Sequence, residues 1–170
     1  IISRSNEAKK LGVEMAGPYF KAKPLIEKYD VAVFSSNYNL YGDLSWRVME
    51  TLRILLGKNK VEVYSVDEAF LDLSIFPENE LPAIAEKIKK IVETWTGIKV
   101  SVGVAPTKVL AKVANRLSKK YVQQYNGVMV LNSKEKIIAA LKQTEVGDIW
   151  GIGYQYAQKL KEQWSIYDAL

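Results

Sequence analysis

The chain has 170 residues, of which 48% are hydrophobic and 25% are charged, a composition typical of a globular protein with a real core. It contains no cysteine and no histidine, which excludes disulfides, thiolate metal sites, thiol nucleophiles and imidazole bases. Lys and Arg number 24 against 19 acidic residues, so the net charge of +5 suits a polyanionic partner. Any chemistry must use carboxylates, lysines, hydroxyls and hard cations such as Mg²⁺.

The spacing of apolar residues predicts helices and strands that alternate along the chain. Gly12 ends the first helix and Pro24 breaks the second. The last 25 residues differ from the rest of the chain, because their expected elements are short helices joined at the glycine turn "GIG". No apolar run approaches the ~20 residues of a membrane span, and no signal peptide is visible. The expected elements are helix 5–12, helix 17–29, strand 31–36, helix 40–57, two strands within 61–74, helix 80–97, strand 98–105, helix 106–120, strand 127–132 and helix 133–143. Their order predicts an α+β fold with helices on one face of a sheet.

Two adjacent acids, Asp67 and Glu68, interrupt the strongest strand sequence, "VEVYSVDEAFLDLS" at 61–74. Neighbouring strand residues point to opposite faces, so both carboxylates can gather on one side only where the chain turns. We therefore expect an antiparallel pair of strands with the acids at their junction. Clustered carboxylates repel each other unless a cation lies between them, and Mg²⁺ suits that position. Judged from these two residues alone, two solvated acids on a hairpin tip are the alternative.

A basic stripe is expected on the helix at 106–120. Lys108, Lys112 and Arg116 recur every four residues and share one face, and Thr107 stands where an N-cap belongs. This stripe is either a clamp for phosphates, aided by the helix N-terminus, or the solvated face of an amphipathic helix.

A glycine turn, "WGIGYQYAQKL" at 150–160, leads into the last helix. Gly151 and Gly153 can expose backbone N–H groups that hold one phosphate of a nucleic-acid strand. Another basic group near the start contains Arg4, Lys9 and Lys10, which by default are surface charges.

The motif "YSVDEAFLDLS", followed by "VSVGVAPTKVLAKVANRLSK", resembles the catalytic core of the Y-family translesion DNA polymerases. The segments "SRSNEAKKLGV" and "VFSSNYNLYGDLSWRVMETL" are similar to the UmuC branch of that family. The resemblance covers essentially the whole chain. It implies a palm, built as a ferredoxin-like sheet with helices on one face, at 37–121. Small fingers are implied at 1–36, and the palm–thumb connection and the start of a helical thumb at 122–170.

The resemblance also implies a catalytic site. Asp67 and Glu68 match the family's paired metal ligands, for which two Mg²⁺ ions are expected and Mn²⁺ is a substitute. Three residues match positions near the triphosphate of the incoming dNTP: Ser3, Lys9 and Lys112.

Further residues are implied to contact DNA. Ile2 matches a position near the nascent base pair, and Gly151 and Gly153 match the thumb's helix-hairpin-helix turn. Lys108 and Arg116 complete the expected DNA-binding set.

Two parts of the family pattern are absent from the printed chain. The strand that carries the family's first catalytic aspartate, with the steric-gate aromatic beside it, would precede Ile1, and the little finger would follow the thumb. We therefore expect the 170-residue chain alone to be inactive as a polymerase.

The activity implied by the resemblance is error-prone, damage-bypassing DNA synthesis in DNA repair and the SOS response. It proceeds by two-metal transfer of dNMP from dNTP to a primer 3′-hydroxyl. The implied partners are primer–template DNA, a UmuD-type subunit, the RecA filament and the sliding clamp, with no membrane, in the bacterial cytoplasm at the nucleoid. Two alternatives stay open, another palm-type nucleotidyl transferase or cyclase and a non-catalytic DNA-binding fragment.

Overall fold

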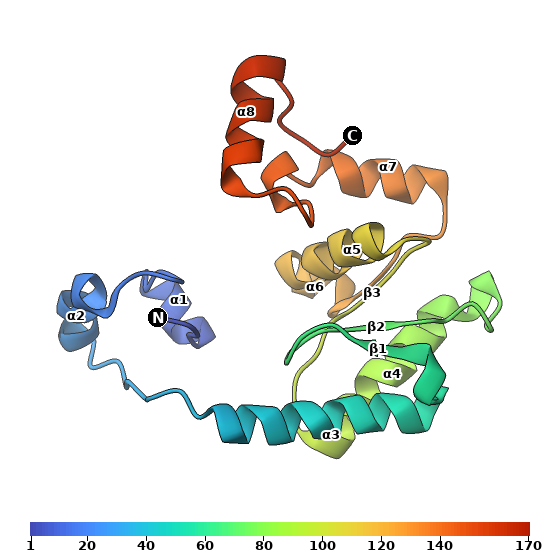
Figure 1. Cartoon of the computed structure of the whole chain (residues 1–170), viewed down its shortest axis with the longest axis horizontal. Coiled ribbons are helices and arrows are strands. Elements are labelled where there is room, and N and C mark those ends of the chain that lie inside the picture. The colour runs from blue at the N-terminus through green and yellow to red at the C-terminus, as the bar shows by residue number, and fades with distance from the viewer. The chain divides into compact units, whose positions relative to one another are not determined.

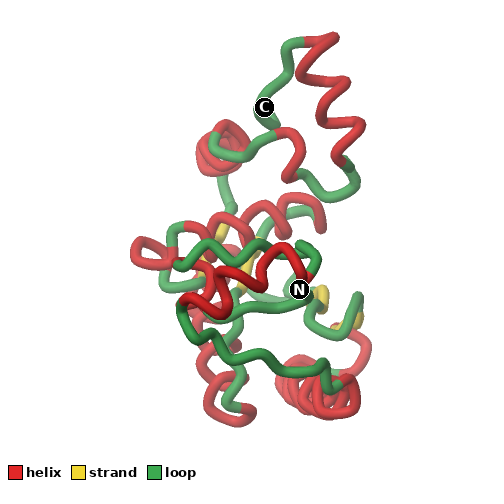
Figure 2. Tube along the Cα trace, turned by 90° about the vertical axis from the view of Figure 1, so that its left-hand side faces the viewer, coloured by secondary structure: helices red, strands yellow, loops and turns green.

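The computed structural model describes residues 1–170 and contains eight α-helices and four short strands (Figure 1). The chain divides into two compact units, Ile1–Tyr38 and Asn39–Leu170, and each is described by itself. Helix dominates the regular structure, and the strands are brief segments among loops (Figure 2). The helices are α1 (Asn6–Lys10), α2 (Tyr19–Lys28), α3 (Tyr38–Leu56), α4 (Leu81–Thr96), α5 (Lys108–Lys120), α6 (Val122–Tyr125), α7 (Lys134–Lys142) and α8 (Tyr154–Trp164). The strands are β1 (Val61–Val63), β2 (Ala69–Leu71), β3 (Val102–Val104) and β4 (Val128–Val130).

None of these helices combines the length and the apolar character that crossing a membrane requires.

The first unit contains the two predicted helices, but its second helix differs from the prediction. Ser5 caps α1 by accepting a hydrogen bond from the Ala8 amide at 3.2 Å. The predicted break at Pro24 is wrong, because α2 runs through it. Proline lacks the N–H that would bond the carbonyl four residues earlier, at Phe20, and its ring crowds that carbonyl. The Phe20 residue is 71% exposed, so water can satisfy that carbonyl.

The strand predicted at 31–36 is wrong as well. No strand forms there, and no other segment of the chain pairs with it. Val33 and Phe34 are 55% and 87% exposed. A strand needs a neighbour that satisfies its backbone N–H and C=O groups, so an apolar run without a partner stays irregular.

The second unit is organised around the predicted hairpin, in which β1 pairs antiparallel with β2. Glu62 lies opposite Phe70. Successive side chains along each strand point to alternate faces of the hairpin. One face is apolar and packs against α3 and α4. The hairpin residues packed there are Val61, Ala69 and Leu71, and the buried helix residues under them are Met49, Leu52, Ile88 and Val92.

The strands β3 and β4 pair in parallel, and α5 lies in the crossover between them (Figure 1). The single sheet expected from the sequence is instead two two-stranded sheets. Each strand keeps only three residues, and no ladder joins the hairpin to β3 or β4. Helix packing replaces the missing ladder. The buried cluster between α5, β4 and α7 contains Val113, Ala114, Leu117, Leu131 and Ala140.

The remaining predicted helices of this unit are confirmed with small shifts at their ends. Gly97, with φ +72°, ends α4 in the left-handed region that favours glycine. Thr107 caps α5 by accepting from the Leu110 amide at 3.3 Å, as predicted. The short helix α6 was not predicted.

Gly103 in β3 allows the closest approach between a strand and a helix in this unit. A Cβ atom there would lie 2.3 Å from the Ala111 carbonyl oxygen and 2.3 Å from the Asn115 amide nitrogen, both backbone atoms of α5. The Asn115 side chain also donates to the Ser101 carbonyl at 2.8 Å, which ties α5 to the segment before β3. The glycine therefore sets how deeply α5 sits on the sheet.

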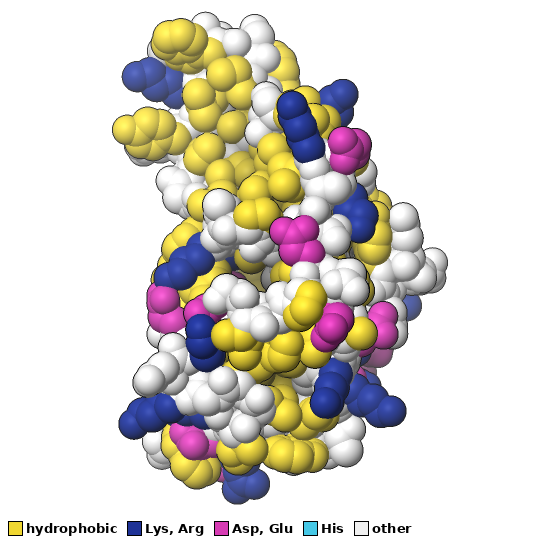
Figure 3. Space-filling model, turned by 90° about the vertical axis from the view of Figure 1, so that its right-hand side faces the viewer, with side chains coloured by type: hydrophobic (Ala, Val, Ile, Leu, Met, Phe, Trp, Pro, Cys, Tyr) yellow, Lys and Arg dark blue, Asp and Glu magenta, His cyan; other side chains and the backbone are white.

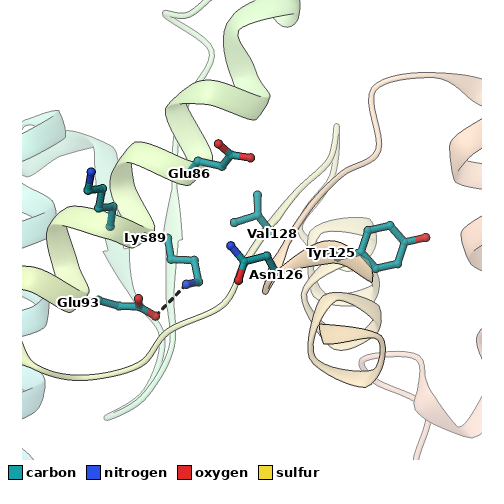
Figure 4. A pocket seen from close by; sticks show the side chains of 7 residues that line it. Glu86, Lys89, Glu93, Tyr125, Asn126 and Val128 are labelled. Carbon is teal, nitrogen blue, oxygen red and sulfur yellow. Dashed lines mark ion pairs between the residues drawn. The ribbon is translucent and has the colours of Figure 1, made fainter. Parts of the chain in front are cut away.

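A hollow of about 340 Å³ lies beside α4, next to the segment that joins α6 to β4 (Figure 4). Glu93 lines it and is mostly buried, with a side chain 17% exposed. Its carboxylate accepts from the Val100 amide at 3.2 Å and pairs with Lys89 at 3.0 Å and Lys99 at 3.7 Å. Burial raises the pKa of Glu93, but the hydrogen bonds and charges of these neighbours outweigh it and hold the pKa below its ordinary value. None of the site residues predicted from the sequence lines this hollow.

We expect Gly103→Ala to lower the free energy of unfolding by about 3 kcal/mol, the upper end of overpacking costs, because the clash is with backbone that cannot rotate away. Urea denaturation measures this loss. The matched control is Gly42→Ala, since Gly42 lies exposed in α3 with nothing within 4 Å of an added Cβ. The control should gain up to ~1 kcal/mol from helix propensity. An unchanged unfolding free energy in Gly103→Ala would show that α5 can shift freely on β3.

We expect Glu93→Gln to cost about 1–2 kcal/mol at neutral pH, because the charged hydrogen-bond network is lost. A native pKa below the unfolded value means that the carboxylate contributes its full stability above the unfolded pKa of ~4.3. That contribution is lost as the pH falls through the native pKa, so the gap between parent and variant should shrink below pH ~4. Denaturation at a series of pH values tests this, with the exposed Glu86→Gln on the same hollow as the control. A gap that stays constant from pH 7 to pH 3 contradicts the sign.

Candidate functional site

The hairpin turn holds both acids that the sequence singled out. The Glu68 carbonyl accepts from the amides of Tyr64 and Ser65, each at 3.0 Å, and these bonds close the loop. The Ser65 hydroxyl then donates to Asp67 Oδ1 at 2.7 Å. The exposed Asp67 carboxylate is therefore oriented by its own turn, and the half-buried Glu68 begins the return toward β2.

The second face of the hairpin carries the polar chemistry. Because side chains alternate, Glu62 and Tyr64 share a face with Glu68 and Phe70, opposite the apolar face described above. This face is turned to α5. Lys108 pairs with Glu62 at 2.5 Å, and Lys112 pairs with both oxygens of Glu68 at 3.0 and 3.1 Å.

The basic stripe of α5 is thus matched by acids along its length. Its third member, Arg116, pairs with Asp148 at 2.5 Å, in the short 3₁₀ segment Val146–Asp148. The stripe is neither a free phosphate clamp nor a freely solvated face in this structure. The side chains of Lys108 and Arg116 stay accessible, at 49% and 55% exposed, whereas that of Lys112 is 26% exposed. Exposed ion pairs contribute only ~0–1 kcal/mol, so a phosphate group can compete for these cations.

Three aromatic residues that the sequence reasoning missed join the site. The rings of Tyr64, Phe70 and Trp150 pack against one another in tilted and edge-to-face arrangements, with centroids 5.4–5.6 Å apart. The Trp150 indole N–H donates to the Tyr64 hydroxyl at 3.1 Å. The strand alternation could have placed Tyr64 and Phe70 beside Glu68, but no sequence signal places Trp150, which is 86 residues from Tyr64.

The predicted glycine turn directly follows Trp150. Gly151 has φ +95°, a conformation that favours glycine, and Gly153 is the N-cap of α8 without a side chain to cap it. Nothing lies within 4 Å of an added Cβ at either position, so the turn is open to solvent. Tyr154 and Tyr156 follow it and are 79% and 70% exposed. On the face drawn in Figure 3, hydrophobic side chains gather at the upper end.

The other predicted residues belong to the first unit. Ile2 is 61% exposed, Ser3 is exposed, and Lys9 lies in the last turn of α1. Asp67, Glu68 and Lys112 belong to the second unit, so the two sets of residues are described separately.

The hairpin turn provides some, but not all, of the oxygen ligands that a hard divalent cation needs. No group of three or more Asp or Glu side chains that could hold a metal ion occurs in the structure. Asp67 and Glu68 provide two carboxylates in adjacent positions, one of them exposed. Mg²⁺ is commonly held by one or two carboxylates together with water and substrate phosphates, so two protein ligands are a sufficient contribution.

Comparison with known proteins gives matches that include the hairpin and α5. The model of a family described as "impB/mucB/samB family" matches residues 1–116. The chain is 41% identical over 161 residues to the protein UmuC of Salmonella typhimurium, covering 94% of this chain and 38% of that protein. It is 29% identical over 164 residues to DNA polymerase IV of Saccharolobus solfataricus, covering 95% of this chain and 44% of that protein. The chain therefore spans about two fifths of the length of these curated relatives.

Solved structures give the fold independently. The chain is similar to the Dbh DNA polymerase in an insertion ternary complex, with a TM-score of 0.80 and 31% identity, covering 96% of this chain and 45% of that chain. It is also similar to a DinB family error-prone DNA polymerase from Sulfolobus solfataricus, with a TM-score of 0.78 and 30% identity, covering 99% of this chain and 48% of that chain. These likenesses confirm the fold class expected from the sequence.

Proposed function

The chain belongs to the impB/mucB/samB family, and from that premise we propose that it forms the catalytic part of a template-directed, translesion DNA polymerase. In the reaction the primer 3′-hydroxyl loses its proton and attacks the α-phosphate of dNTP, which adds dNMP to the primer and releases pyrophosphate. The observation that carries this proposal is the pairing of Glu68 with Lys112 next to Asp67. It brings a metal-binding carboxylate and a phosphate-binding cation, 44 residues apart in the chain, to one place.

The division of labour follows the family pattern. Residues 1–36 serve as small fingers, 37–121 as the palm, and 122–170 as the palm–thumb connection and the start of the thumb. The boundary between compact units at Tyr38 and Asn39 supports the first division, since it falls two residues from the proposed one. Small fingers enclose the nascent base pair loosely, which weakens shape selection and permits copying past damaged bases.

Asp67 and Glu68 hold the divalent metal in this proposal, with two Mg²⁺ expected and Mn²⁺ as a substitute. The metal supplies Lewis acidity, which activates the primer hydroxyl and offsets charge on the triphosphate. The orientation of Asp67 by the Ser65 hydroxyl supports this role, because a carboxylate fixed beforehand loses less conformational entropy when it coordinates a cation.

Phosphate groups are bound by the cations and hydroxyls around that centre. Lys112 donates to the triphosphate and neutralises charge that develops there. Ser3 and Lys9 of the first unit contact the same phosphates, and Ile2 contacts the nascent base pair. The exposure of Ile2 and Lys9 in the structure supports these roles.

The DNA track uses the open glycine turn and the outer members of the basic stripe. Backbone N–H groups at Gly151 and Gly153 hold one phosphate of a strand, in the manner of other helix-entry turns. Lys108 and Arg116 contact further phosphates by exchanging their present partners, Glu62 and Asp148.

The substrates of the whole protein are primer–template DNA and dNTP. A UmuD-type subunit, the RecA filament and the sliding clamp are its partners, in the bacterial cytoplasm at the nucleoid. The similarity to a DNA polymerase in a ternary complex supports the two substrates, and the other partners and the location are carried over from the family resemblance.

In the intact protein, we expect Asp67→Asn or Glu68→Gln to abolish primer extension while primer–template affinity changes less than about threefold. The acids hold metal, whereas phosphate contacts dominate DNA affinity. Extension on a primed template and fluorescence anisotropy of labelled DNA measure the two quantities. The matched control is Glu78→Gln, an exposed acid of the 3₁₀ segment Glu78–Glu80. Near-normal turnover in Asp67→Asn removes the metal-ligand role, and loss of turnover in the control points to general misfolding.

We expect Asp148→Asn to raise DNA affinity by about two- to fivefold, because Arg116 no longer has to leave a carboxylate whose ion pair contributes up to ~1 kcal/mol. Arg116→Gln should weaken DNA binding uniformly across sequences and lower the slope of log affinity against log salt by about 1. Anisotropy titrations at several salt concentrations measure both. Equal affinities in parent, Asp148→Asn and Arg116→Gln would place Arg116 outside the DNA track.

A further inference from the structure

The Lys112 ammonium is enclosed by one carboxylate and two aromatic rings. Its Nζ atom lies 3.0 and 3.1 Å from the Glu68 oxygens and 5.1 and 5.4 Å from the ring centroids of Tyr64 and Trp150. The side chain is only 26% exposed. Tyr64, Glu68 and Trp150 are together called the lysine cage below.

The lysine cage is itself held in shape. The Trp150 indole donates to the Tyr64 hydroxyl at 3.1 Å, and the two rings meet edge to face at 86°. Phe70 packs against both rings with centroids 5.6 Å away. Aromatic faces attract an ammonium group, so the rings add to the charge pairing and favour one position of Lys112.

A second cation on Glu68 would compete electrostatically with Lys112 in this arrangement. Both of its carboxylate oxygens accept from Lys112, so another cation that takes Glu68 as a ligand must displace the ammonium or suffer repulsion from it. In the same way, two of the three N–H donors of Lys112 are directed at Glu68, which leaves one for a phosphate while that pair lasts.

We propose that Lys112 is a stand-in cation on Glu68, kept there by Tyr64 and Trp150, and that a divalent cation exchanges with it and frees the ammonium for phosphate. Tyr64 and Trp150 are then positioning residues that act through Lys112. The inference rests on the proposed function, which supplies the metal and the phosphate, but the exchange on Glu68 is measurable without polymerase activity. Lys112 is released to donate fully to a phosphate when Glu68 gains another cation.

Trp150 can report the exchange directly. The other three tryptophans, Trp46, Trp95 and Trp164, are 61%, 57% and 68% exposed, so changing them to Phe leaves Trp150 as the sole indole at little structural cost. In this 170-residue single-tryptophan chain, Mg²⁺ should cause a saturable change in Trp150 emission as the ammonium leaves the ring. KCl at matched ionic strength should not cause it, and neither should Mg²⁺ added to the Glu68→Gln variant.

Lys112→Met tests the competition itself. Without the competing ammonium, calorimetry should show Mg²⁺ affinity raised by about fivefold, the factor that corresponds to the loss of one ion pair. Trp150 emission should start at its released value and no longer respond to Mg²⁺. The matched control is Lys60→Met, which removes a lysine paired to Asp72 at 2.6 Å on the same hairpin and should leave Mg²⁺ affinity unchanged.

Trp150→Leu separates positioning from mere structural support. Loss of the ring loosens Lys112 from Glu68, so Mg²⁺ affinity should rise by about two- to threefold, whereas damage to the site would lower it. Trp150→Phe keeps an aromatic face and should give an intermediate affinity. Circular dichroism and the thermal midpoint of each variant confirm that the fold is retained.

Three results would overturn the proposal: no Mg²⁺ binding in parent and Lys112→Met, binding without a change in Trp150 emission, or an affinity in Lys112→Met no higher than in the parent. A Trp150 response in the chain together with no primer extension by the intact protein would leave the exchange standing and reject the polymerase function. Extension without the Trp150 response would do the reverse.

Discussion

The second unit depends on a hairpin whose two faces carry different chemistry. Strand alternation assigns Val61, Ala69 and Leu71 to one face, which is held on α3 and α4 by burial of apolar surface. The same alternation forces Glu62 and Glu68 onto the other face, where α5 meets them with Lys108 and Lys112. The packing that stabilises the fold therefore also fixes which side chains can reach the turn at Asp67 and Glu68.

The position of α5 is set by a second constraint, at Gly103. Since β3 approaches the helix backbone within the reach of a single Cβ atom, α5 has little freedom to move away from or along the sheet. Lys112 projects from this helix toward Glu68. The precision of the Glu68 pair thus depends on backbone contacts that α5 makes beside Lys112, at Ala111 and Asn115, with a residue that carries no functional group.

Much of this arrangement follows from local sequence, and the rest requires tertiary contacts. The hairpin, its acids, the Thr107 cap and the Gly97 helix end were predictable, because alternation and capping act over a few residues. The irregular conformation of residues 31–36 was not predictable, because the apolar pattern there does not reveal that no other strand pairs with it. The lysine cage also escaped sequence reasoning. Tyr64 and Phe70 were within reach of the alternation rule, but Trp150 arrives from a segment whose approach no local pattern specifies.

The pairing of the α5 cations with carboxylates makes the site sensitive to the ionic strength of the solution. No histidine, the side chain whose charge ordinarily changes between pH 5 and 8, takes part in these pairs. Ionic strength, by contrast, acts on every one of them, since exposed charges are screened over a Debye length of about 8 Å in physiological salt. The ion pairs around the hairpin therefore weaken as salt is added.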